Sequence, residues 1–242
     1  MRHSVGKSPG VKSYLKRLVL PPGKVPRVVR GGLLAGLSME VDFAHQTQLW
    51  LGLQERELCS WFRRFSKGIH TAIDVGANEG AYTLYFLAKT SAQRVLAFEP
   101  SPENLFHLKG NLELNHLSAD HRLEIVPKFV GRSPGNEWIA LDVFWQSIIS
   151  PCLVKVDIDG GEVELLRGAQ GLLRMPGVRW IIEVHSRELK EECLEILRAA
   201  KYCTVVVPNA WWRYFLPELR PTELNHWVVA MSEGFQENGS DR

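Results

Sequence analysis

The sequence predicts an α/β fold, with a mostly parallel sheet, helices on both faces and an antiparallel hairpin at its C-terminal edge. From residue 71 onward, runs rich in Val, Ile and Leu alternate with helical segments. Continuous apolar runs are typical of strands in a parallel sheet that is covered on both faces. The chain has 242 residues, 45% hydrophobic and 23% charged. That length and composition favour a single globular α/β domain.

Seven runs are expected to be strands. They are 71–75, 94–100, 122–131, 152–159, 179–185, 203–208 and 226–231. The last two are too close in sequence for another long helix, so they are expected to pair as the edge hairpin. Helices are expected at 45–66, 80–90, 101–115, 161–173 and 186–200. The third of these has clear start signals, with Ser101 as N-cap and Pro102 at the first helical position.

Charge and composition divide the chain into three parts. Residues 1–38 are expected to form a disordered basic leader. Residues 1–30 carry eight Lys and Arg and no acid, whereas the rest of the chain has 21 basic and 27 acidic residues. Such an arm can touch phosphate or an anionic surface. Residues 39–235 are expected to form one domain, with an N-terminal helical segment (39–70) and a core (71–235). Residues 236–242 read as a tail.

The sequence shows no secretory signal, and no stretch reaches the ~18 apolar residues of a membrane span. Its four cysteines include no C-x-x-C pair. Reduced thiols and a cytoplasmic location are the simplest expectation. Sequence-specific nucleic-acid binding is not expected, because the basic leader lacks interleaved aromatic residues apart from Tyr14.

Acidic residues stand at the ends of several expected strands. These are Asp74, Glu99, Asp157 and Glu183, the last followed by His185. Isolated carboxylates are disfavoured inside strands. In open α/β sheets, ligands bind beyond the carboxyl ends of the strands. The sequence therefore predicts a polar crevice at this edge.

The turn after the first core strand, "DVGANEGAYT" (74–83), indicates the ligand. It lacks the G-x-G-x-x-G spacing of a dinucleotide site, and Glu79 puts negative charge where a pyrophosphate would bind. A ligand with an amino group, a carboxylate and an adenosine fits better. Asp74 could hold the ammonium, Glu99 could accept the ribose hydroxyls, and the glycines would allow close backbone approach. That ligand is S-adenosylmethionine.

Several motifs in order resemble the FkbM family of S-adenosylmethionine-dependent methyltransferases. They are "DVGANEGAYT" (74–83), "FEPSPENLFHLKGNLELN" (98–115), "VKVDIDGGEVELLRGA" (154–169), "IIEVH" (181–185) and, upstream, "LGLQERE" (51–57). The resemblance covers about residues 45–190 and implies a class I, Rossmann-like methyltransferase fold. Two departures are visible: Arg132 stands after Gly131 where the family often has Asp, and "DIDGGE" replaces Asp-x-Glu-Gly-Ala-Glu.

The resemblance also implies roles for particular residues. Asp74, Gly76, Asn78 and Gly80 would form the cofactor loop. Glu99 would bind the ribose. Asp157 would lie near the methionine part or the substrate, and Glu55 would contact the cofactor from the N-terminal segment.

Methyl transfer to a hydroxyl needs alignment and a base. His185 and Asp157 are the candidate catalytic residues, with Asp159 as a further candidate base. Each also has a structural reading: His185 as a strand-end hydrogen-bonding group, Asp157 as a helix N-terminal contact. Asp157, Asp159 and Glu162 could alternatively bind a divalent cation, but no metal is expected. The aromatic residues Trp211, Trp212, Tyr214 and Phe215 could line a sugar site or pack in the core.

We therefore expect an S-adenosylmethionine-dependent methyltransferase that acts on a hydroxyl of a small molecule, sugar or glycan. The first alternative is a binding protein with a degenerate methyltransferase fold, motivated by the altered "DIDGG" turn and the short segment 131–151. The second is a nicotinamide-dependent oxidoreductase, which the missing glycines and Glu79 disfavour. Fold alone does not determine substrate.

Overall fold

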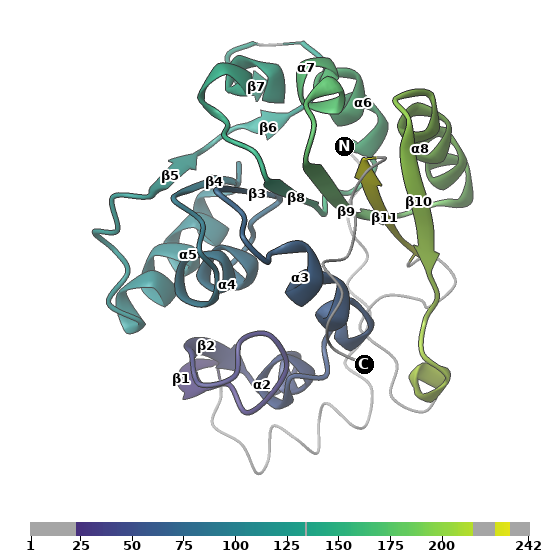
Figure 1. The fold of residues 1–242 in the computed structure, drawn as a ribbon. Coiled ribbons are helices and arrows are strands. Elements are labelled where there is room, and N and C mark those ends of the chain that lie inside the picture. Colours follow the sequence, from purple (N-terminus) through teal and green to yellow (C-terminus); the bar gives the residue numbers. More distant parts are fainter. Residues whose placement is uncertain (1–22, 134, 215–225, 233–242) are drawn as a thin grey trace.

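One seven-stranded sheet organises the chain (Figure 1). The computed structural model describes residues 23–133, 135–214 and 226–232. The strand order is β10-β11-β9-β8-β3-β4-β5. The strands are β3 (Thr71–Val75), β4 (Arg94–Phe98), β5 (Leu123–Val126), β8 (Cys152–Val156), β9 (Val178–Val184), β10 (Tyr202–Val207) and β11 (His226–Ser232). Each overlaps a run that was expected to be a strand.

The sheet is mostly parallel, as predicted. Neighbouring strands run parallel from β5 through β4, β3 and β8 to β9. Strands β3, β8 and β9 are buried along their whole length, which explains their continuous apolar runs. Strand β11 is antiparallel to both β10 and β9. The predicted hairpin is confirmed, but only β10 forms the edge, because β11 inserts between β10 and β9.

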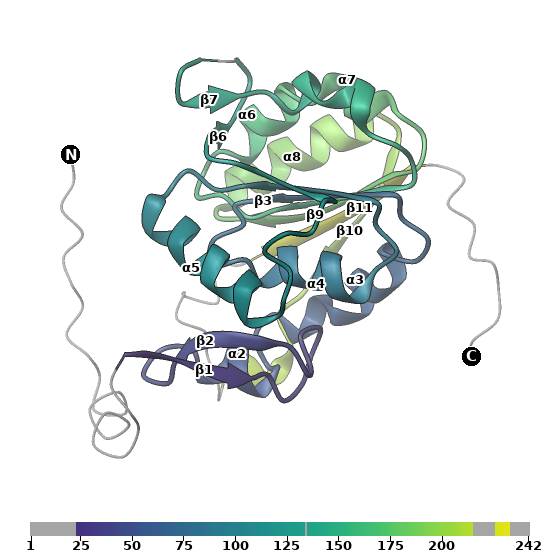
Figure 2. The ribbon, with the colours of Figure 1, turned by 90° about the vertical axis from the view of Figure 1, so that its left-hand side faces the viewer.

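Helices cover both faces of the sheet (Figure 2). On one face lie α3 (Cys59–Phe65), α4 (Ala81–Lys89) and α5 (Pro102–Leu114); on the other lie α6 (Glu162–Arg167), α7 (Gln170–Arg174) and α8 (Arg187–Ala199). Each face has its own apolar cluster. The first includes Phe62 and Phe86, and the second includes Trp180 and Leu166, all four fully buried. The two layers thus bury both faces of the sheet and leave its carboxyl edge as the place to look for a site.

Two expected elements are interrupted where backbone chemistry requires it. Pro127 has no N–H to donate, and the run 122–131 divides there into β5 and β6 (Phe129–Val130). Strand β6 pairs with β7 (Trp138–Ile139) outside the main sheet. The helix expected at 161–173 divides into α6 and α7 around Gly168. A Cβ at Gly168 would lie 2.2 Å from the Gly131 carbonyl oxygen, so the close approach of that loop requires glycine.

The segment 45–66 is also not one helix. It forms α2 (Thr47–Leu51), a 3-10 helix (Arg56–Leu58) and α3. Gly52 ends α2 with a left-handed φ of 71°, a typical helix C-terminal conformation. Three further 3-10 helices lie at Leu141–Val143, Trp145–Ser147 and Trp211–Tyr214. Of the aromatic segment, Phe215 lies outside the described residues.

An N-terminal hairpin packs beneath α5. It consists of β1 (Lys24–Val28) and β2 (Ser38–Asp42). Asn111 on α5 accepts a hydrogen bond from the Glu40 N–H at 2.7 Å, and Asn115 accepts one from the Ser38 N–H at 2.9 Å. Residues 1–22 of the expected leader lie outside the described residues, whereas residues 24–38 belong to this ordered unit.

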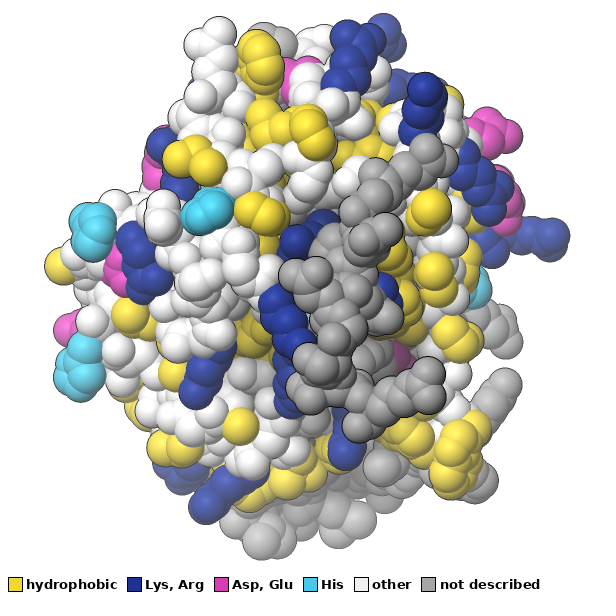
Figure 3. All heavy atoms as spheres, viewed as in Figure 1, with side chains coloured by type: hydrophobic (Ala, Val, Ile, Leu, Met, Phe, Trp, Pro, Cys, Tyr) yellow, Lys and Arg dark blue, Asp and Glu magenta, His cyan; other side chains and the backbone are white. Residues whose placement is uncertain are grey.

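In the part of the chain that the structure describes, none of the helices has both the length and the apolar character needed to span a membrane. Exposed apolar side chains occupy several separate places among Lys and Arg on the face shown in Figure 3. Large exposed ones include Phe106, Phe129, Trp138, Val143, Trp145, Ile149 and Trp211.

Candidate functional site

The turn after β3 is built around a close approach to the end of β8. Gly76 has a φ of 72°, and a Cβ there would lie only 1.9 Å from the carbonyl oxygen of Asp157. The Asp157 N–H donates to the Val75 carbonyl at 3.0 Å. Gly76 is therefore required by the protein's own backbone. It brings the expected cofactor loop and Asp157 to one place on the carboxyl edge.

Gly80 and Asn78 shape the rest of the turn. Gly80 precedes α4 with a φ of 87°, and a Cβ there would lie 3.0 Å from Cγ of Leu108, so Gly80 allows α4 and α5 to pack. Asn78 also has a positive φ, 51°, a conformation that Asn tolerates better than most residues. The Glu79 side chain points to the N-terminal part of the chain, where it contacts Lys24 at 2.7 Å and Gln46 at 3.0 Å.

Asp74 is fully buried below the turn, where its carboxylate accepts one hydrogen bond and forms one ion pair. The Thr83 hydroxyl donates to Oδ2 at 2.7 Å, and Nζ of Lys155 lies 3.2 Å from Oδ1. Lys155 Nζ also donates to the Gly76 carbonyl at 2.8 Å. The cation that contacts Asp74 in this structure therefore belongs to the chain itself.

Lys155 is a site residue that the sequence analysis missed. It lies in the buried strand β8, and its side chain is 6% exposed. Burial lowers the pKa of Lys155, but the nearby carboxylates of Asp74, Asp157 and Glu55 outweigh it, so that its pKa is raised. A lysine in the apolar run "CLVKV" was the signal, since charged residues are rarely buried without a partner.

Glu99 lies at the end of β4 and is 5% exposed. Its Oε2 accepts the Asn78 N–H at 2.8 Å, and its Oε1 accepts the Ser101 N–H at 2.9 Å and the Asn104 side-chain amide at 3.2 Å. The carboxylate thus joins the glycine turn to the start of α5. The juxtaposition of turn and carboxylate agrees with the sequence-based expectation for these two strand ends.

Glu55 reaches the same network through Tyr82. Glu55 has a left-handed φ of 46°, and the Tyr82 hydroxyl donates to its carboxylate. Burial and the adjacent Glu55 raise the pKa of Tyr82 well above its ordinary value. The Tyr82 ring lies 5.1 Å from Nζ of Lys155. Glu55, Tyr82, Lys155 and Asp74 therefore form one connected polar chain beneath the turn.

His185 lies among four carboxylates at the ends of β8 and β9. Its Nδ1 is 2.5 Å from Oε1 of the fully buried Glu162. Its Nε2 is 3.6 Å from Asp157, 3.4 Å from Asp159 and 3.7 Å from Glu183. The structure therefore brings the two predicted catalytic residues, His185 and Asp157, together. Glu183, which was expected at the same strand end as His185, belongs to the group, and so does Glu162, which sequence reasoning had not linked to His185.

A buried arginine anchors the connection between β10 and β11. Arg213 is 2% exposed and binds both carboxylate oxygens of Glu57, at 2.8 and 2.7 Å. Its guanidinium lies 4.3 Å from the Trp212 ring centroid. The neighbouring Trp211 is 75% exposed. Within the aromatic segment, Trp212 therefore packs on a buried ion pair and Trp211 is exposed, while a sugar site at these residues stays a prediction.

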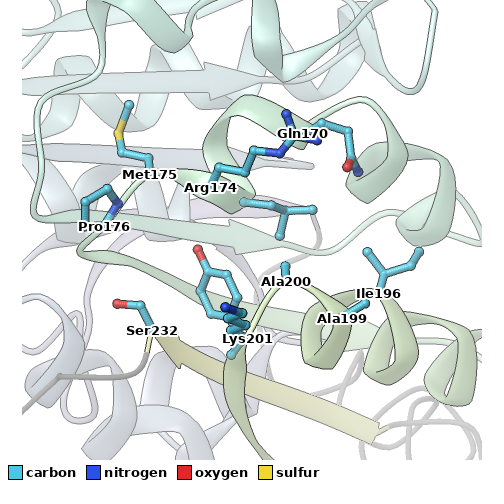
Figure 4. Close-up of a pocket in the computed structure, with 11 residues that line it drawn as sticks. Gln170, Arg174, Met175, Pro176, Ile196, Ala199, Ala200, Lys201 and Ser232 are labelled. Carbon is cyan, nitrogen blue, oxygen red and sulfur yellow. The ribbon is translucent and has the colours of Figure 1, made fainter.

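A separate cavity of about 680 Å³ lies at the opposite end of the sheet. Gln170, Arg174 and Lys201 line it together with residues at the start of β10 and the end of β11 (Figure 4). It is at the amino ends of the parallel strands, away from Asp74, Glu99 and Asp157. Since ligands of open α/β sheets bind beyond the carboxyl ends, we assign the candidate site to the carboxyl edge.

The sequence matches no protein-family model and no curated protein. Among solved structures, the chain is similar to the methyltransferase FkbM from Methylobacillus flagellatus KT, with a TM-score of 0.53 and 16% identity, covering 78% of this chain and 55% of that one. It is also similar to the METTL16 MTase domain, with a TM-score of 0.52 and 15% identity, covering 81% and 74%. An rRNA methylase from Streptococcus thermophilus has a TM-score of 0.50 and 14% identity, covering 73% and 95%.

These likenesses confirm the expected fold class. The chain has the class I, Rossmann-like fold of methyltransferases. It spans little more than half the length of the FkbM methyltransferase.

Proposed function

We propose that this chain is an S-adenosylmethionine-dependent methyltransferase that acts on a hydroxyl of a small molecule, sugar or glycan. The observation that carries the proposal is the hydrogen bond from the Asn78 N–H to Glu99 at 2.8 Å. It places a glycine-containing turn and a carboxylate side by side at adjacent carboxyl ends of β3 and β4. An acid beside such a turn suits a ligand whose ribose hydroxyls donate to it.

The donor and acceptor groups around the turn fit this cofactor. The Glu99 carboxylate has about four acceptor positions, and three of them are used by the Asn78 N–H, the Ser101 N–H and the Asn104 amide, so a ribose hydroxyl can donate to the remaining position on Oε2. The backbone of residues 76–80 would border the ligand, with Gly76, Asn78 and Gly80 setting its shape. Asp157, with a side chain 22% exposed, would face the methionine part. Asp74 would influence cofactor binding indirectly, through the turn and Lys155. Glu55 would influence it indirectly, through Tyr82.

When bound, S-adenosylmethionine supplies a methyl group that passes to the acceptor oxygen as the carbon–sulfur bond breaks and its electron pair returns to sulfur. The chain must align the acceptor and let the hydroxyl proton leave. His185 and Asp157 lie together at the carboxyl edge and would activate that hydroxyl. A positioned acid–base group contributes roughly 10²–10⁴-fold in rate.

The motif resemblance to the FkbM family supports O-methylation, and the structural likeness to the FkbM methyltransferase supports the fold that such an enzyme needs. Another structural neighbour is an rRNA methylase. We favour a smaller acceptor because the basic residues 1–30 have no interleaved aromatic pattern of a nucleic-acid binder. The exposed ring of Trp211 is suited to stack on a sugar face.

Calorimetry of the full chain with S-adenosylmethionine, S-adenosylhomocysteine and NAD tests the cofactor. The two sulfur ligands should bind and NAD should not. Methyl-labelled S-adenosylmethionine added with cell extract should then label an acceptor only when the protein is present. Absence of S-adenosylhomocysteine binding at ~1 mM ligand would overturn the proposal. Binding without label transfer would instead support the binding-protein alternative.

A further inference from the structure

We propose that Asp157, Glu183 and His185 bind one divalent cation, and that this cation holds an oxygen of the acceptor. The inference rests on the proposed function for the acceptor, whereas the cation site itself rests on the geometry of these three side chains. Asp157 follows β8, Glu183 lies in β9 and His185 follows it. One potential ligand atom from each lies within 4.8 Å of the other two.

The spacing of the ligand atoms supports a shared ion. His185 Nε2 is 3.6 Å from Oδ1 of Asp157 and 3.7 Å from Oε1 of Glu183. Those separations exceed normal hydrogen-bond lengths. Two ligands of one ion at ~2.1 Å, with angles of about 90–120° between them, stand about 3.0–3.6 Å apart. The separations of His185 from Asp157 and from Glu183 are therefore close to those between ligands of a common cation, and small side-chain rotations would complete the geometry.

The second supporting feature is the orientation of His185. Its Nδ1 is 2.5 Å from Glu162 Oε1. With Nδ1 donating, Nε2 directs its lone pair toward Asp157 and Glu183. A carboxylate that accepts the other ring N–H is the usual support of a metal-bound histidine. Glu162 is 0% exposed, and its Oε2 accepts no hydrogen bond from the described residues. A buried anionic group of this kind raises the field that attracts a cation.

The concentration of negative charge around His185 also favours a bound cation. Four carboxylates, those of Asp157, Asp159, Glu162 and Glu183, converge on one imidazole. A divalent ion among them would offset the mutual repulsion of these negative charges. Lys155 lies on the other side of Asp157, 3.9 Å from Oδ2. Asp157 can therefore contact Lys155 with Oδ2 and a cation with Oδ1.

The ligand types indicate the class of ion and of acceptor. Two carboxylates with one imidazole suit a cation such as Mn²⁺, which accepts both oxygen and nitrogen ligands. Three protein ligands leave coordination positions open for acceptor oxygens. A cation lowers the pKa of a hydroxyl bound to it, so His185 and Asp157 would then activate the hydroxyl as ligands of the cation, and the proton would leave to solvent. Acceptors with two neighbouring oxygen atoms would bind best.

The test is direct Mn²⁺ binding to the full chain after treatment with a chelator. Calorimetry should give one ion per chain, and the electron paramagnetic resonance signal of free Mn²⁺ should fall in proportion. Glu183→Gln and His185→Ala should each weaken Mn²⁺ binding by at least about tenfold. The matched control is Glu164→Gln, an acid on α6 with a half-exposed side chain paired with Arg167, which should bind Mn²⁺ as the wild type does.

Circular dichroism and thermal unfolding check that each variant folds, and Asp157→Asn replaces any variant that does not. No Mn²⁺ binding at ~1 mM, or equal binding in the wild type and the ligand variants, would overturn the cation site. S-adenosylhomocysteine binding is measured separately in excess chelator. If it persists while Mn²⁺ does not bind, only the cation proposal fails. If Mn²⁺ binds but S-adenosylhomocysteine does not, only the methyltransferase proposal fails.

Discussion

The Lys155 ammonium lies 3.2 Å from the Asp74 carboxylate, with the two side chains 6% and 0% exposed. Asp74 lies beneath the glycine turn. Lys155 also donates a hydrogen bond to the Gly76 carbonyl and lies 3.9 Å from the Asp157 carboxylate. The ion pair therefore connects the ends of β3 and β8, where the cofactor loop and the acceptor site would meet. Its role is to hold these two strand ends in register.

Lys155→Met should strongly destabilise the protein, because it leaves Asp74 charged and buried without its cation. Removal of one partner of a buried pair typically costs about 3–5 kcal/mol of the free energy of unfolding. Urea denaturation measures the effect, with Lys89→Met on the exposed end of α4 as control. Asp74→Asn combined with Lys155→Met should recover part of the loss. A loss below ~1 kcal/mol would show that the pair is not structurally important.

Gly76→Ala should destabilise the turn and abolish cofactor binding, because its Cβ would lie 1.9 Å from the Asp157 carbonyl oxygen. Gly68→Ala is a matched control: Gly68 has a similar φ of 66°, but nothing lies within 4 Å of its Cβ. The control should lose only about 1 kcal/mol, from the positive φ. Urea denaturation and calorimetry with S-adenosylhomocysteine compare the two. Equal losses would show that backbone strain alone matters at Gly76.

Glu99→Ala should weaken S-adenosylhomocysteine binding by ~10-fold or more, because charge-assisted hydrogen bonds contribute ~1.5–3 kcal/mol. The substitution also removes the acceptor of the Asn78 N–H, so the turn loses a support. Calorimetry measures the affinity, and Glu103→Ala, an exposed acid in the first turn of α5, is the control. A folded Glu99→Ala protein with wild-type affinity would remove Glu99 from the site.

His185→Ala should lower kcat by about 10²-fold or more while S-adenosylmethionine affinity stays within about threefold. The reason is that His185 acts on the acceptor side of the site, and His121→Ala, an exposed residue, should leave kcat unchanged. Steady-state kinetics and calorimetry separate the two effects. If Asp157→Asn carries the loss and His185→Ala does not, the carboxylate activates the hydroxyl and the histidine is structural.

The Glu57–Arg213 pair should make stability depend on acidic pH. Burial raises the pKa of Glu57, but hydrogen bonds from Arg213 and the Ala210 N–H outweigh it, so its pKa lies below the ordinary value. The contribution to stability is then fully present above the unfolded pKa of about 4.3 and is lost as pH falls through the lower folded pKa. Urea denaturation of the wild type and Glu57→Gln should show a stability difference that shrinks on acidification. A difference independent of pH would contradict this account.

Local patterns determined much of the fold. The apolar runs predicted the strands of the main sheet, and the Ser101-Pro102 signal marked the start of α5. Strand-end acids predicted that Asp74, Glu99, Asp157 and His185 gather at one edge, because carboxyl ends of parallel strands lie together. These features depend on period, capping and strand direction, which are readable over short stretches of chain.

Only the tertiary structure decided which groups face one another. Lys155 meets Asp74 across 81 positions of sequence and Glu162 meets His185 across 23, because register and helix placement set those contacts. The insertion of β11 between β9 and β10 likewise depends on long-range pairing. The requirement for glycine at position 76 also depends on tertiary structure, because the clash comes from the carbonyl oxygen of Asp157, which follows a different strand. Sequence supplied the residue types at the carboxyl edge, and packing determined which of them bind each other and which remain for ligands.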